Sequence, residues 1–138
     1  MNSEAALFIE ISRSTLESVK ADFERTNSMT IKSRLDFYKA HELPVKAIMV
    51  EKGGSLTQDN KLTSLCKSIG LWPVIPPKFQ SYLHEIDCYG LDSSQPDELV
   101  HKSNEWRNRL AIAPKFVFFI ENQILRSPTV LKGIGLLS

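Results

Sequence analysis

The sequence has few features that would require an unusual environment or a cross-link. It has two cysteines in 138 residues, its three histidines are scattered along the chain, and a single histidine–cysteine pair, His84 and Cys88, lies at helical spacing, which is too few ligands for a zinc ion. A zinc site is therefore not expected, and Cys66 and Cys88 are predicted to be reduced, structural thiols. No apolar run approaches the roughly 20 residues that span a bilayer. The amino-terminal residues also lack the basic and apolar segments of a secretory signal, so we expect a cytoplasmic protein with no membrane partner.

The chain also lacks an excess of either charge. Its formal net charge is +1, and 24% of its residues are charged against 42% hydrophobic. This balance argues against a dominant electrostatic partner such as duplex DNA or an anionic membrane. The length is typical of one domain with a core of its own. We therefore expect residues 1–138 to form a single domain.

Apolar runs of strand length alternate with stretches of helical periodicity. Strands are predicted at residues 6–11, 45–50, 72–75 and 115–120. Two of these runs are almost wholly apolar, as in strands buried on both faces of a parallel sheet. The predicted fold class is therefore α/β, a single three-layer domain with a largely parallel central sheet flanked by helices. An α+β arrangement stays open if the first helical region is a hairpin on one face.

The helices between these runs have recognisable start and stop signals. Ser14 and Glu17 form a capping-box pattern, and the helix that they begin is interrupted at residues 26–28. A second helix should stop before Pro44, Gly70 should end a third helix, and Pro77 should open a fourth. Helical spacing and the last apolar run predict one shared core, made by Leu16, Val19, Phe23, Leu62, Leu65, Ile69, Phe118 and Ile120.

Three of the predicted strands lead into a glutamate, namely Glu10, Glu51 and Glu121. In open parallel sheets, ligands bind beyond the carboxyl ends of the strands. Clustered carboxylates repel one another unless a cation joins them, and oxygen ligands suit Mg²⁺ or Mn²⁺. Such a site could activate a water molecule against a phosphodiester. The alternative is that these residues are ordinary polar ends of strands.

A fourth acid, Asp59, begins a predicted helix, where a carboxylate also stabilises the free backbone amides. The surrounding pattern comprises Thr57-Gln58-Asp59, Leu62, Leu65, Gly70, Val74-Ile75, Pro76-Pro77 and Phe79. Over residues 57–79 the chain resembles PIN-domain ribonucleases. The resemblance implies that Asp59 binds metal and that Glu10, with Ser12 nearby, stands where the family places its first aspartate.

A small basic group lies toward the carboxyl end of the chain, and it consists of Lys102, Arg107, Arg109 and Lys115. These side chains could contact an RNA backbone, or they could be the solvated face of a helix.

Two hypotheses follow from these patterns. The first is a metal-dependent nuclease acting on RNA, in which Glu10 and Asp59 are catalytic and hold Mg²⁺ or Mn²⁺ together with Glu51 and Glu121. The second is a non-catalytic protein-interaction module, such as an inhibitor, immunity or adaptor protein, which binds a protein partner through a surface. The absence of any complete catalytic motif favours the second hypothesis.

Overall fold

The described part of the chain is helical, so the predicted α/β class is wrong there. The computed structural model describes residues 1–52, 61–91 and 103–125. Within these ranges there is no strand, and the elements are α1 (Ser3–Thr26), α2 (Ile31–Glu51), α3 (Leu62–Ser68), the 3₁₀ turn η1 (Trp72–Val74), α4 (Pro77–Leu91) and α5 (Ser103–Leu125). The expected turn at Gly53-Gly54 and the tail after residue 125 lie outside the described residues.

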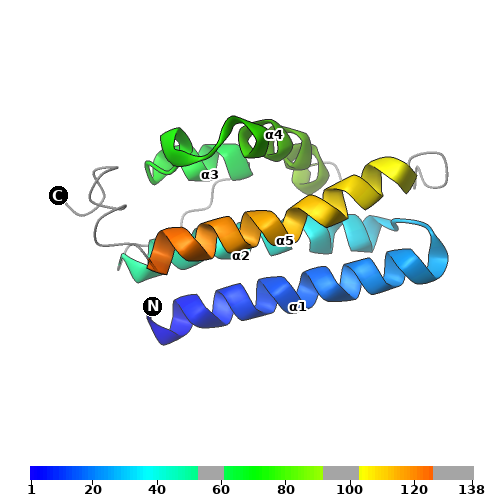
Figure 1. The fold of residues 1–138 in the computed structure, drawn as a ribbon, viewed down its shortest axis with the longest axis horizontal. Coiled ribbons are helices and arrows are strands. Elements are labelled where there is room, and N and C mark those ends of the chain that lie inside the picture. The colour runs from blue at the N-terminus through cyan, green and yellow to red at the C-terminus, as the bar shows by residue number, and fades with distance from the viewer. Residues whose placement is uncertain (53–60, 92–102, 126–138) are drawn as a thin grey trace.

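The helices pack around α2 as the central element. It contacts α1, α3, α4 and α5, and Figure 1 shows α1 on one side of the bundle with α3 and α4 on the other. Helix α5 lies beside α1 and runs in the opposite direction (Figure 1). This arrangement leaves α1 and α5 as neighbours on one outer side of the molecule.

Helix α1 begins earlier than its capping signal predicted. Asn2 caps it, with its side-chain oxygen accepting from the Ala5 N–H at 2.7 Å, and Ser14 lies inside the helix. The predicted first strand, residues 6–11, is therefore helical. The interruption at residues 26–28 is confirmed, because Asn27 ends the helix with a left-handed backbone at φ 54°. Asparagine adopts this conformation more readily than most residues.

Helix α2 continues through Pro44 and includes the predicted second strand, residues 45–50. Val45, Ala47, Ile48 and Met49 are all buried. A helix covered on all sides becomes apolar all round and loses its amphipathic pattern, so a short part of it reads like a buried strand. The missing proline N–H frees the Ala40 carbonyl, and the Ser12 hydroxyl donates to that carbonyl at 2.5 Å.

Helix α3 confirms the predicted inward-facing Leu62 and Leu65, and Gly70 follows it with φ 75°. No side chain of its own first turn caps this helix. Instead, the Asp87 carboxylate of α4 accepts from the Leu62 N–H at 2.6 Å and from the Thr63 hydroxyl at 2.5 Å. The predicted strand at residues 72–75 is wrong, since Trp72–Val74 is a 3₁₀ turn that leads to α4 at the predicted Pro77.

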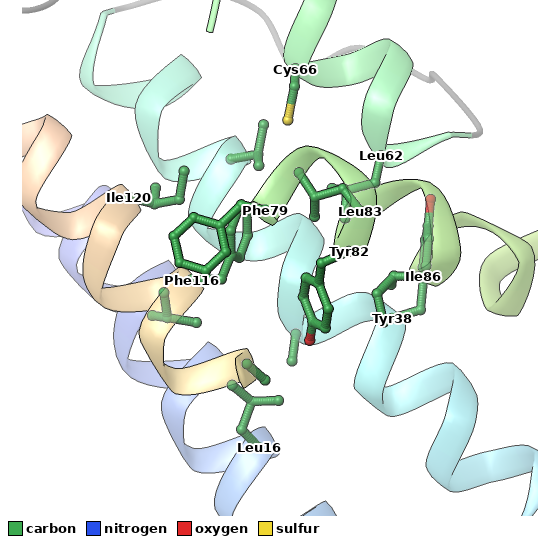
Figure 2. Packing of buried hydrophobic residues seen from close by; sticks show 14 of the residues in the cluster. Leu16, Tyr38, Leu62, Cys66, Phe79, Tyr82, Leu83, Ile86, Phe116 and Ile120 are labelled. Atoms are coloured by element: carbon green, nitrogen blue, oxygen red, sulfur yellow. The ribbon is translucent and has the colours of Figure 1, made fainter. Parts of the chain in front are cut away.

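Helix α5 replaces the last predicted strand, residues 115–120, and continues through Pro114. Phe116, Val117 and Ile120 are buried in it, whereas Phe118 is 59% exposed. The other seven residues of the predicted core share one buried cluster. Figure 2 shows Phe116 and Ile120 packing beside Phe79 of α4, and the rings of Phe79 and Phe116 meet edge to face at 5.9 Å. Phe118 was assigned to the core because a strand was assumed.

Candidate functional site

Two of the predicted metal ligands, Glu10 and Glu121, line the same surface depression between α1 and α5. Glu121 is held by Arg13, whose Nη1 donates to Oε2 at 3.1 Å and whose Nη2 donates to Oε1. These hydrogen bonds raise the pKa of the Arg13 guanidinium. The Glu121 carboxylate is therefore already neutralised by a cation of the chain.

The other predicted ligands lie elsewhere. Glu51 ends α2 and accepts from the Asn2 N–H at 2.6 Å, with the ammonium group of Met1 3.6 Å away. Asp59 lies outside the described residues. Within residues 1–52, 61–91 and 103–125, no three acidic, histidine or cysteine side chains form a group that could hold a metal ion. The strand ends that were expected to bring the glutamates together do not exist there.

The predicted basic group does not form one surface. Arg107 is exposed, and it donates to Asn27 at 2.9 Å and to Asn104 at 3.1 Å. Arg109 is buried, lies over the Trp106 ring and forms an ion pair with Glu85. Lys115 is exposed, and Lys102 lies outside the described residues. Arg107 lines a depression between helices α1 and α5.

The core holds a polar pair that the sequence analysis did not identify. His41 of α2 is fully buried, and its Nδ1 lies 2.7 Å from the Phe37 carbonyl, which can only accept. Nδ1 therefore carries the proton, and Nε2 accepts from the Tyr82 hydroxyl at 2.6 Å. Burial lowers the pKa of His41 to about 4, so the ring stays neutral and acts as a structural link between α2 and α4.

Two further polar groups of the core also serve the fold. The buried Asp87 carboxylate caps α3, as described above. Burial, with a smaller contribution from Asp87, raises the pKa of the free thiol Cys66 to about 12. Such a thiol stays protonated and is a poor nucleophile, which confirms its predicted structural role. The side chain of Cys88 lies outside the described residues.

A surface feature does stand out between α1 and α5. Three depressions adjoin one another there, since the first two share Lys20 and Leu110 and the last two share Arg13 and Glu17. The largest has a volume of about 320 Å³. We call this continuous feature the α1–α5 groove. Along α1 it extends from Ala6 to Asn27, which corresponds to roughly 30 Å at the rise of an α-helix.

The floor of the α1–α5 groove is apolar and its edges are charged. Leu16 and Phe23 of α1 and Leu110 of α5 form this floor in the first two depressions. Ala111 and Pro114 form its α5 edge, and Phe118 lies one turn further along the same stripe of that helix. The charged residues at its edges are Glu10, Arg13, Glu17, Lys20, Glu24, Arg107 and Glu121.

The sequence does contain a signal for this groove. Glu10, Arg13, Glu17, Lys20 and Glu24 recur at intervals of three and four residues, which places them on one face of a helix. This spacing is meaningful only if the helix starts before residue 10. It was not recognised because residues 6–11 were predicted to form a strand.

Comparisons with protein-family models, with curated proteins and with solved structures find no match for this chain. The resemblance to PIN-domain ribonucleases stays a prediction from residues, of which 57–60 lie outside the described ranges. None of the helices in the described ranges combines the length and apolar character needed to cross a lipid bilayer.

Proposed function

We propose that this chain is a non-catalytic protein-interaction module that binds a protein partner through the α1–α5 groove. The observation that carries the proposal is the groove itself, which is roughly 30 Å long, has charged edges and has an apolar floor over its central part from Leu16 to Phe23. Apolar grooves between helices are a recurrent way of receiving a helix of another protein. A partner surface placed here would add a further layer of helices to the bundle.

The charges in the groove favour a protein over a nucleic acid. Lys20 and Arg107 are cationic, but Glu10, Glu17 and Glu24 also line the groove. An RNA backbone presents one negative charge after another and is bound by continuous positive surface. A protein surface offers both signs and apolar side chains together, which is what this groove can complement.

The polar residues that could act in catalysis or bind a metal ion also favour a protein-interaction module. His41 is buried and neutral, Asp87 caps α3, and Glu121 is paired with Arg13. A general base needs access to a substrate proton, and the Glu121 carboxylate already has the Arg13 guanidinium as its cation. The nuclease hypothesis therefore gains nothing from the described residues, whereas the interaction hypothesis gains a surface.

The proposal is tested by placing a photo-crosslinking amino acid at Ala111, on the groove edge, in cells that make the protein. The matched control carries the same amino acid at Ser81, an exposed position on α4. We expect a discrete protein adduct from position 111 that maps to one segment of its partner and is lost when Lys20→Glu is added. Equal adducts from both positions, or none from position 111, would contradict the proposal.

A further inference from the structure

We infer that the partner in the α1–α5 groove is a second copy of this chain, docked groove to groove about a twofold axis. The inference rests on the proposed function, because it assumes that the groove is the binding surface. It adds the identity of the partner, and the argument for that identity is the order of charges along the groove.

The two ends of the groove carry opposite charge. The end near the start of α1 is lined by Glu10, Glu17 and Glu121 against the single cation Arg13, a formal charge of −3 + 1 = −2. Met1 also lines this end, but its ammonium group lies beside Glu51. The other end has Lys20 and Arg107 against Glu24, a formal charge of +2 − 1 = +1.

A twofold axis that crosses the middle of the groove at right angles to its length places each end over the opposite end of the second copy. In such an isologous contact the same patch is used by both chains, so the patch must complement itself. The cations Lys20 and Arg107 of one chain then face Glu10 and Glu17 of the other, and the contact occurs twice. A parallel arrangement would instead bring like charges together, which is unfavourable.

The apolar residues fit the same arrangement. Leu110 and Pro114 lie near the middle of the groove, since both line its central depression. Phe118, which is 59% exposed in the single chain, lies on the same stripe of α5, one turn from Pro114. A second copy placed over the groove would remove this ring from water. Apolar burial at the centre and charge pairing at the ends is the usual anatomy of a protein interface.

The test is the self-association of the full chain measured by sedimentation equilibrium over a wide concentration range. One variant, Lys20→Glu with Arg107→Glu, makes both ends acidic, and the other, Glu10→Lys with Glu17→Lys, makes both ends basic. We expect each variant alone to self-associate about tenfold or more weakly than the natural chain, as expected for like-charge juxtaposition. An equimolar mixture should associate at least as tightly as the natural chain, because every end then faces its opposite.

The controls separate folding from docking. Lys39→Glu on α2 makes the same charge change as Lys20→Glu alone, at an exposed position outside the groove, and should leave self-association unchanged. Because Arg107 also tethers Asn27, Lys20→Glu alone and Ala111→Arg, which obstructs the groove sterically, are measured beside it. Circular dichroism melts check that each variant is folded.

Three outcomes would overturn the inference that the partner is a second copy. They are a natural chain that stays monomeric, a dimer that no groove variant weakens, and a mixture that does not restore association. A monomeric chain whose position 111 still crosslinks one foreign protein would overturn only this inference and support the proposed function.

Discussion

Ser12 of α1 supplies the hydrogen bond that Pro44 removes from α2. Pro44 has no N–H to offer the Ala40 carbonyl four residues earlier, and the Ser12 hydroxyl donates to that carbonyl at 2.5 Å in a fully buried position. A proline inside a helix is normally costly, partly because a carbonyl loses its donor. Here a side chain from the neighbouring helix replaces that donor and joins α1 to α2.

We expect Ser12→Ala to lower the free energy of unfolding by about 1–3 kcal/mol, because the buried Ala40 carbonyl loses its donor. In the background of Pro44→Ala, whose new N–H can bind Ala40, the same change should cost much less. Denaturant melts of the two single variants and the double variant give this coupling directly. Additive effects would mean that the hydroxyl does not compensate for the proline.

The buried His41–Tyr82 pair should make the protein sensitive to acid. Above pH 6.5 the His41 ring is neutral in both the folded and the unfolded chain, so it contributes no pH dependence. Below pH 6.5 the unfolded chain binds a proton that the folded chain does not bind until about pH 4. The free energy of unfolding should therefore fall on acidification through this window, by up to about 1.4 kcal/mol per pH unit.

The contribution of this pair is isolated with a double variant, His41→Leu with Tyr82→Phe, which removes both hydrogen-bonding partners. Its stability should fall less steeply than that of the natural chain between pH 6.5 and about 4, as measured by urea melts at each pH. Parallel curves for the two proteins would show that another group causes the acid sensitivity.

Two phenylalanines of α5 two residues apart should respond differently to truncation. Phe116 is fully buried, and Phe116→Ala should cost about 3–5 kcal/mol. Phe118 is largely exposed, so Phe118→Ala should change the stability of the single chain by no more than about 0.5 kcal/mol. Thermal melts at a concentration where the chain is monomeric provide the measurement. Equal costs would indicate a strand-like environment in which both rings are covered.

Magnesium should not stabilise the protein through Glu121, whose carboxylate is already paired with Arg13. Binding to the folded state raises the melting temperature by mass action, and the described carboxylates form no shared site for an ion. Glu121→Gln should instead lower stability by about 1 kcal/mol or less, with or without the metal, because it weakens an exposed ion pair with Arg13. A concentration-dependent rise in the melting temperature that Glu10→Gln abolishes would restore the metal hypothesis.

The inward faces of the amphipathic segments could be predicted from the sequence, and the fold class could not. Leu16, Val19 and Phe23 recur at helical spacing because α1 has one face against the bundle and one against water. The same reasoning located Leu62 and Leu65 in α3. In both segments a polar face marks the period, so local pattern and tertiary environment agree.

The misassigned strands lie where that polar face is missing or the helix start was misread. Around Val45 to Val50 the central helix α2 is covered on most sides, so the sequence keeps no period to read. Pro44 is also a helix stop signal in the sequence. Its effect is offset by the hydrogen bond from Ser12, a residue thirty-two positions earlier that comes close only in the folded chain. The wrong strands also led to the wrong site. Glu51 and Glu121 were expected to lie together at the ends of strands, and the α1–α5 groove was not predicted. The groove depends instead on α1 lying antiparallel to α5.

The cap that Asp87 provides for α3 has a consequence for how the chain is made. A seven-residue helix is too short to be stable by itself in water, and α3 takes its N-terminal hydrogen-bond acceptor from α4. During synthesis, which proceeds from the amino terminus, residues 62–68 leave the ribosome before residue 87 leaves it. Segment 62–68 is therefore uncapped at first, while α1 and α2 can already pair, and its helix should become stable only after α4 has left the ribosome.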